Sequence, residues 1–148
     1  MPSLQQYFMR LSYRHTPDSI CGCLRQMSTV LIVDDDPDIV NIFRIFLARE
    51  GHTPITASDG KVCLEKLQQF KCDVILLDIM MAPMDGWETL TQIKNNPQTS
   101  SIPVIMVTGK PLEKREEETY GTMFYKYLMK PVRRTELCEV VRRAANSL

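Results

Sequence analysis

The chain has 148 residues, and its 18 basic and 18 acidic side chains give a formal net charge of zero at pH 7. This length suits one domain with a sizeable hydrophobic core. The even charge balance gives no general attraction to nucleic acid or to an anionic membrane surface. No apolar run approaches the ~20 residues of a membrane-spanning helix. We therefore expect a soluble single domain that binds neither nucleic acid nor membrane.

Five cysteines are scattered along the chain. Cys63 and Cys138 fall at apolar positions of expected helices and Cys72 precedes an expected strand, so we interpret these three as small core residues. Cys21 and Cys23 form a Cys-Gly-Cys sequence. With two histidines in the chain and no second cysteine pair nearby, a metal or redox site there is disfavoured. The pattern fits a reduced, cytoplasmic compartment.

Residues 1–27 differ in composition from the rest of the chain. They mix Arg, Ser, Gln, Tyr and Pro without helical or strand periodicity. They lack the apolar core of a secretory signal, although several arginines and few acids are also features of transit peptides. We expect either a disordered extension or a misassigned start, with translation beginning at Met27. The domain itself is expected over residues 28–148.

Strand and helix patterns alternate from Thr29 onward, which favours a parallel sheet built from βαβ units. Apolar runs predict five strands, at residues 30–33, 53–57, 74–77, 104–107 and 127–129. The second of these contains Pro54, which cannot donate a hydrogen bond to a neighbouring strand. This strand should therefore lie at an edge of the sheet.

Capping residues and apolar stripes predict a helix after each strand. Asp36 and Pro37 start the first helix and Gly51 ends it. The apolar faces of the second, third and last helices are marked by Cys63, Leu64 and Leu67, by Trp87, Leu90 and Ile93, and by Leu137, Val140, Val141 and Ala144. The last helix should begin near Thr135. The segment 112–124 is mostly charged and has a thin apolar stripe, so we expect a marginal or mobile fourth helix there.

The expected strands end in polar or charged residues. These are Asp34, Asp35, Asp78, Thr108 and Lys130. Because the carboxyl ends of parallel strands open into one crevice, we expect these side chains to gather. Two carboxylates ~4 Å apart repel each other by about 4 kcal/mol at an effective dielectric of about 20. Three carboxylates therefore need a cation, and oxygen ligands favour Mg²⁺ or Mn²⁺.

Such a site suits phosphoryl chemistry. A carboxylate can attack phosphorus and carry the group as an aspartyl phosphate. The metal and the ammonium group of Lys130 would neutralise the phosphoryl oxygens, and the hydroxyl of Thr108 would donate a hydrogen bond to one of them. The residues alone thus predict a metal-and-phosphate site.

The motifs taken together resemble the receiver domain of two-component response regulators, in particular the single-domain chemotaxis regulators. They are LIVDDDPD at 31–38, DIMMAPMDG at 78–86, Val107-Thr108 and Lys130-Pro131. The resemblance covers residues 28–148. It implies a flavodoxin-like, doubly wound (βα)5 sheet of the α/β class with strand order 2-1-3-4-5. That order places the second strand at an edge, in agreement with Pro54.

The resemblance also implies a cofactor and its ligands. Asp78 would accept a phosphoryl group in a Mg²⁺-dependent reaction, with Mn²⁺ as a possible substitute. Asp35, Asp78 and the main-chain carbonyl of Met80 would bind the ion, and Asp34 would act through water. Thr108 and Lys130 would bind the phosphoryl group.

The resemblance further implies a switch and partners. Tyr127 matches the aromatic switch position of the family, and the bond before Pro131 is expected to be cis. The phosphoryl donor would be a sensor histidine kinase or a histidine phosphotransfer protein. With no output domain after Leu148, the protein would switch the binding of a downstream protein target. That target would bind the face formed by residues 112–124, the fifth strand and the last helix. Beyond its own phosphorylation and dephosphorylation, no enzymatic activity is expected.

Several positions depart from the family pattern. Ala82 stands where a proline is usual, and Pro83 follows it. Gly109 replaces a common alanine, and Met123–Lys126 replaces the Gly-Ala pair usual before the switch aromatic. These changes indicate unusual partner specificity. Met80, two positions after the acceptor, has no group that orients water, so we expect slow hydrolysis of the phosphoryl group.

Three alternative functions fit the sequence less well. Asp34-x-Asp36 superficially matches the nucleophile motif of haloacid-dehalogenase-like phosphatases, but that motif needs Thr or Val where Asp38 stands. A dinucleotide-binding domain would need a glycine-rich turn after the first strand, where the three aspartates stand. A degenerate receiver that acts only as an interaction module is disfavoured because every acidic position and the lysine are intact.

Overall fold

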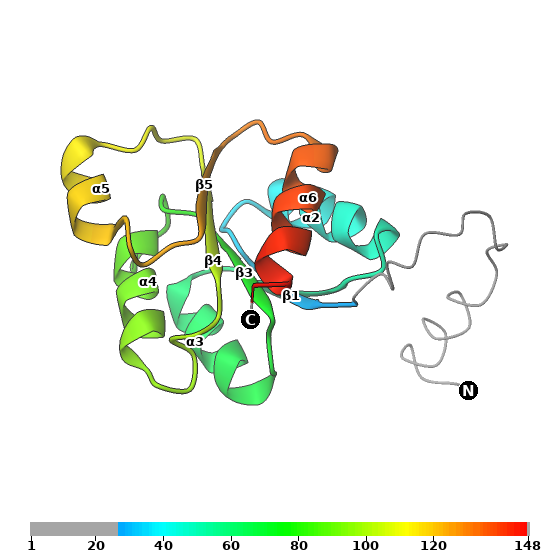
Figure 1. The fold of residues 1–148 in the computed structure, drawn as a ribbon, viewed down its shortest axis with the longest axis horizontal. Helices are drawn as coiled ribbons and strands as arrows, with labels where there is room; N and C mark the ends of the chain where they lie inside the picture. Colours follow the sequence, from blue (N-terminus) through cyan, green and yellow to red (C-terminus); the bar gives the residue numbers. More distant parts are fainter. Residues whose placement is uncertain (1–26, 148) are drawn as a thin grey trace, which may run out of the picture.

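A computed structural model describes residues 27–147 of the chain (Figure 1). Its strands form one parallel sheet in the order β2-β1-β3-β4-β5. They are β1 (Thr29–Val33), β2 (Thr53–Ala57), β3 (Val74–Leu77), β4 (Val104–Thr108) and β5 (Lys126–Met129). The predicted fold class and strand order are confirmed. The extension or misassigned start predicted over residues 1–27 lies, except for Met27, outside the described residues.

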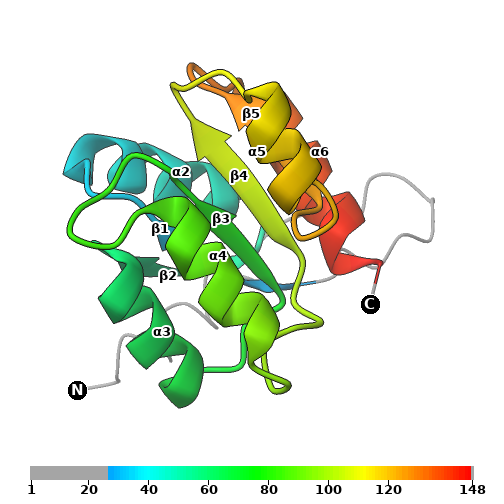
Figure 2. The ribbon, with the colours of Figure 1, turned by 90° about the vertical axis from the view of Figure 1, so that its left-hand side faces the viewer.

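Helices cover both faces of the sheet (Figures 1 and 2). On one face pack α2 (Pro37–Arg49) and α6 (Arg134–Ala145), and on the other lie α3 (Gly60–Gln69), α4 (Gly86–Asn95) and α5 (Lys114–Tyr120). The strands β1, β3 and β4 are almost wholly buried between these layers, which explains their continuous apolar sequences. No helix in the described part of the chain is long and apolar enough to span a bilayer.

The strand order places a crevice between β1 and β3. After β1 the chain passes through α2 to the edge strand β2 and returns through α3 to β3, on the other side of β1. The helix after β1 and the helix after β3 therefore leave toward opposite faces. Their departure opens the sheet at its carboxyl edge, where ligands bind in folds of this kind.

Local signals in the sequence set the bounds of the first elements. The side chain of Asp36 accepts a hydrogen bond from the amide of Asp38 at 2.9 Å, and Pro37 is the first residue of α2. Gly51 adopts a positive φ of 89° just after the helix, a conformation that favours glycine. Pro54 lies in β2, which pairs only with β1. The predicted caps and the predicted edge strand are confirmed.

The fourth predicted helix is shorter than its segment. Helix α5 covers Lys114–Tyr120 instead of 112–124, and none of its residues is buried. Its start is fixed by a capping box between Glu113 and Glu116, and after Gly121 the chain turns away toward β5. The thin apolar stripe explains this short helix, because too little apolar surface is available to hold a longer one against the sheet.

Smaller differences concern the last helix and the prolines. Helix α6 begins at Arg134, and Val140 is only half-buried, since it lies at the border of the core. The peptide bond before Pro131 is cis as predicted, and the bond between Ala82 and Pro83 is also cis. Of the cysteines, Cys63 and Cys72 are buried core residues and Cys138 is half-buried, whereas Cys21 and Cys23 lie outside the described residues.

Candidate functional site

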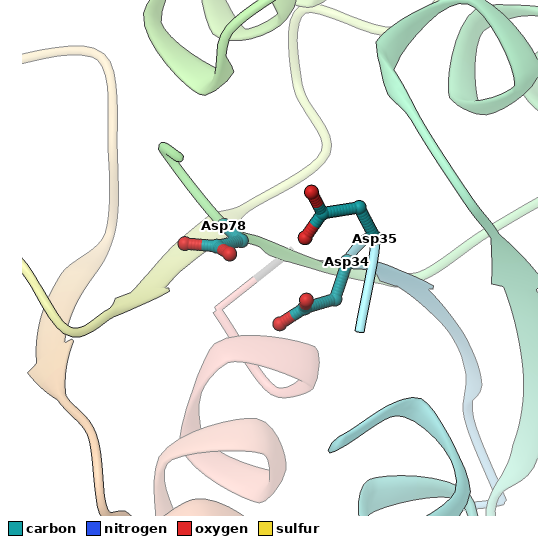
Figure 3. A group of neighbouring side chains, drawn as sticks. All are labelled: Asp34, Asp35 and Asp78. Atoms are coloured by element: carbon teal, nitrogen blue, oxygen red, sulfur yellow. The ribbon is translucent and has the colours of Figure 1, made fainter. Parts of the chain in front are cut away.

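Three aspartates converge at the crevice between β1 and β3 (Figure 3). Asp34 and Asp35 directly follow β1, and Asp78 directly follows β3. The amide of Asp78 donates to the carbonyl of Val33 at 3.0 Å, so the backbone pairing continues to the site. Each aspartate offers a carboxylate oxygen, and these oxygens lie within 4.8 Å of one another. The structure thus brings together the acids that the sequence predicted would meet.

The three acids differ in their exposure to solvent. Asp34 and Asp78 are buried, with 4% and 5% of their surface exposed, while Asp35 is exposed. Burial raises the pKa of the Asp34 carboxyl above its usual value, and the nearby charge of Asp78 raises it further. Taking like charges out of water is costly, so the site favours cations beside it.

Lys130 supplies one of these cations. Its Nζ lies 2.6 Å from Oδ2 of Asp34 and 3.3 Å from Oδ2 of Asp78. Burial alone would lower the pKa of Lys130, but the hydrogen bond and the charge of Asp34 and the charge of Asp78 raise it above its ordinary value. The ammonium group therefore stays charged at neutral pH and bridges the two buried acids.

Asp35 keeps an open coordination position. Within residues 27–147, no lysine or arginine side chain forms an ion pair with it. One lysine among three carboxylates leaves the site with a net negative charge, and all three offer hard oxygen ligands. This donor set fits Mg²⁺ or Mn²⁺ and does not fit a softer metal such as zinc.

Thr108 and Lys130 are adjacent at the ends of neighbouring strands. The amide of Lys130 donates to the carbonyl of Thr108 at 2.8 Å. The Thr108 side chain is fully buried, and its Oγ1 accepts a hydrogen bond from the amide of Lys110 at 3.4 Å. In the β3–β4 register Leu77 pairs with Met106, so Thr108 lies one position beyond the residue opposite Asp78.

The two remaining predicted residues lie near the site in different ways. The amide of Met80 donates to Oδ1 of Asp78 at 3.3 Å, and 63% of the Met80 surface is exposed. The hydroxyl of Tyr127 donates to the carbonyl of Lys110 at 2.6 Å. Tyr127 is therefore connected to Thr108 through a single intervening residue, Lys110.

Two features of the site were missed by sequence reasoning. A cleft of about 310 Å³ opens beside Asp34 and Asp35 between α2 and β2, and Asn41, Arg44 and Ser58 also line it. The side chain of Lys110 binds Glu116 of α5. Only the presence of Arg44 on the expected helix after the acids could have indicated the cleft, and no spacing in the sequence indicates the contact with Glu116.

Comparisons with known proteins agree with this geometry. The family model described as the response regulator receiver domain matches residues 30–142. Protein PilH of Pseudomonas aeruginosa is 33% identical over 117 residues, which cover 78% of this chain and 95% of PilH. A probable cyclic di-GMP phosphodiesterase of Vibrio cholerae is 43% identical over 104 residues, but these are only 23% of that protein. The chain therefore spans less than a quarter of that relative.

Solved structures show the same fold. The N-terminal domain of a response regulator receiver protein from Methanoculleus marisnigri is 47% identical, with a TM-score of 0.69, over 80% of this chain and 96% of that one. Chemotaxis protein CheY4 of Vibrio cholerae is 28% identical, with a TM-score of 0.74, over 80% and 99%. Strand order, acidic site and family match agree, and the chain belongs to the response regulator receiver domain family.

Proposed function

We propose that the protein is a phosphorelay response regulator in which Asp78 accepts a phosphoryl group from a histidine kinase or a histidine phosphotransfer protein. The observation that carries this proposal is the bridge from Lys130 to Asp34 and Asp78 beside the third carboxylate of Asp35. This arrangement supports the proposal because a carboxylate that could attack phosphorus, the cation of Lys130 and the oxygen ligands of Asp35 lie close together.

The transfer is a single displacement at phosphorus. An oxygen of the Asp78 carboxylate forms the new bond, while the bond between phosphorus and the donor's imidazole nitrogen breaks. The electron pair of that bond stays on the nitrogen, which takes up a proton. Lys130, already 3.3 Å from Asp78, neutralises charge on the transferred group, and the Thr108 hydroxyl donates to one of its oxygens.

Asp35, Asp78 and the main-chain carbonyl of Met80 would hold Mg²⁺, with Asp34 acting through water. The ion would supply charge neutralisation for the phosphoryl oxygens. Of the three acids, Asp35 is the exposed one and forms no ion pair within the described residues, so it is free to serve as a ligand. Asp34, which binds Lys130 at 2.6 Å, is suited to a contact through water.

The output is a change in partner binding. Tyr127 would act as the switch residue, since its hydroxyl already binds the loop after Thr108. The downstream target would be a protein that binds the face formed by α5, β5 and α6, where Tyr125 and Met129 expose 43% and 45% of their surface. The protein would act in the cytoplasm, where its kinase partner and a reducing environment for its cysteines are found.

Phosphorylation can be tested directly. The purified protein is incubated with acetyl phosphate and Mg²⁺, and its intact mass is measured. We expect the wild type to gain the mass of one phosphoryl group and the Asp78→Asn variant to show no gain. A gain that persists in Asp78→Asn would contradict the assignment of the acceptor. No gain in the wild type would favour a degenerate receiver, and steady release of phosphate from acetyl phosphate with no covalent form would favour a phosphatase.

A further inference from the structure

The carboxylate of Glu116 lies at the centre of a set of contacts outside the acidic site. Its Oε1 accepts a hydrogen bond from Nε1 of Trp87 at 2.9 Å and also binds Nζ of Lys110. Its Oε2 accepts from the amide of Glu113 at 3.1 Å. Only 14% of the Glu116 side chain is exposed. Both oxygens are used, and the carboxylate is held in one position.

These contacts are a main attachment of α5 to the body of the protein. The helix contains no buried residue. Tyr120, in its last turn, stacks on Trp87 with ring centroids 4.5 Å apart and an interplanar angle of 7°. A hydrogen bond and a stacked ring pair thus join α5 to the same tryptophan.

Trp87 is in turn fixed relative to the proposed acceptor. It follows Gly86, whose amide donates to the carbonyl of Ile79 at 2.9 Å. A Cβ at Gly86 would lie 2.3 Å from the carbonyl oxygen of Asp78, so the first turn of α4 rests directly on the backbone of Asp78. The indole of Trp87 consequently holds Glu116 at a set position with respect to the site.

Lys110 closes a ring of contacts among four residues, the other three being Glu116, Trp87 and Tyr127. Its ammonium group binds Glu116, its amide donates to Oγ1 of Thr108 at 3.4 Å, and its carbonyl accepts from the hydroxyl of Tyr127 at 2.6 Å. The ring of Tyr127 lies 6.4 Å from that of Trp87. The conformation of the loop that orients the Thr108 hydroxyl therefore depends on where Glu116 holds the Lys110 ammonium group.

We propose that Glu116 is a positioning residue for phosphoryl transfer to Asp78, an inference that rests on the proposed function. By binding both the Lys110 ammonium group and the Trp87 indole, it fixes the loop after β4 and with it the Thr108 hydroxyl.

The test compares Glu116→Gln with Glu118→Gln, a matched change at an exposed position of the same helix. Phosphorylation by acetyl phosphate with Mg²⁺ is followed by intact mass over a range of donor concentrations. We expect Glu116→Gln to lower the maximal rate about tenfold, the change typical of losing a charge-assisted hydrogen bond. The donor concentration at half-maximal rate should stay unchanged, since Glu116 does not touch the donor. Glu118→Gln should stay within about twofold of the wild type in both quantities.

A second variant, Lys110→Met, removes the other half of the ion pair at a partly exposed side chain. It should lower the maximal rate to a similar extent, and the double variant should be no slower than the slower single one, because both changes break one interaction. Thermal unfolding is measured for each variant to check that it is folded at the assay temperature.

The outcomes separate the two proposals. If the wild type gains no phosphoryl group, the proposed function is wrong and this inference falls with it. If the wild type is phosphorylated but Glu116→Gln matches Glu118→Gln, only the positioning role is wrong. The positioning role would also be wrong if the effects of the two single changes multiplied in the double variant. It would be wrong as well if the only change were a higher donor concentration at half-maximal rate.

Discussion

At the scale of single residues, Lys130 decides the electrostatics of the site. Among residues 27–147, it is the one cation that bridges the buried carboxylates of Asp34 and Asp78. Breaking a partly buried ion pair by removing one partner leaves the other charge uncompensated, which is more costly than the pair is stabilising. The folded state should therefore depend on this lysine even where no phosphoryl group is present.

We expect Lys130→Met to lower the free energy of unfolding by about 2 kcal/mol in metal-free buffer at pH 7. The methionine keeps an unbranched apolar side chain of similar length and removes the ammonium group with its charge and its hydrogen bonds. Urea denaturation in the presence of EDTA measures the effect. Lys126→Met, at an exposed position of β5, the strand that ends one residue before Lys130, is the control. Equal losses in the two variants would show that the bridge to the acids contributes nothing special.

We expect the exposed side chain of Met80 to govern the lifetime of a phosphoryl group on Asp78. It lies two residues after Asp78 and offers no donor or acceptor to an attacking water. Met80→Asn should therefore speed the loss of the phosphoryl group, by roughly tenfold if one oriented water is gained. The decay is followed by intact mass after the donor is removed. Decay of the wild type as fast as that of the mutant would contradict this explanation.

At the scale of elements, the junction of β3 and α4 leaves no room for a side chain at Gly86. The nearest atoms to a Cβ there are backbone atoms of Asp78 and Ile79, which cannot turn aside. Gly86→Ala should destabilise the fold by about 2–3 kcal/mol. A Cβ at Gly109 would meet nothing within 4 Å, so Gly109→Ala should be close to neutral in the same denaturation experiment. Similar stabilities of the two variants would rule out the close approach.

The junction of α2 and β2 gives the fold a pH dependence. Burial lowers the pKa of His52, and its Nδ1 accepts from the amide of Ser28 at 3.4 Å. Because the unfolded chain binds this proton more readily, stability falls as the pH drops below the ordinary histidine value, about 6.5. We expect a loss of less than about 1 kcal/mol between pH 7 and pH 5, since the ring is partly hydrated. Over this pH range His52→Gln should lose less stability than the wild type. An equal loss of stability would contradict the role of His52.

Sequence patterns predicted most elements because the signals are local. A buried parallel strand needs a continuous apolar run, and Asp36 and Gly51 mark the ends of α2 by backbone chemistry. The packing of α5 could not be predicted in this way, since it involves the stacking of Tyr120 on Trp87, far away in the chain. The meeting of the acids with Lys130 could be predicted, because the topology of a parallel sheet brings the ends of its strands together. The contact of Glu116 with Trp87 could not, because it joins side chains that are far apart in the chain.

At the scale of the whole molecule, metal binding at the acidic site would be coupled to folding. Carboxylates from two strands meet only in the folded chain, so an ion bound there stabilises the fold by mass action. Adding Mg²⁺ should raise the midpoint of thermal unfolding, with a shift that grows with the logarithm of the ion concentration. Asp35→Asn should lose most of the shift. Asp38→Asn, an exposed acid of α2 outside the cluster, should keep it, and a shift that survives in both variants would place the ion elsewhere.

The sole tryptophan of the chain lies at the junction between the backbone of Asp78 and α5. Its indole is hydrogen-bonded to a carboxylate and stacked on a tyrosine ring, two surroundings to which indole emission is sensitive. The fluorescence of the unlabelled protein consequently reports on this one place. Trp87 is thus an intrinsic fluorescent probe at the place where the backbone of Asp78 and α5 meet.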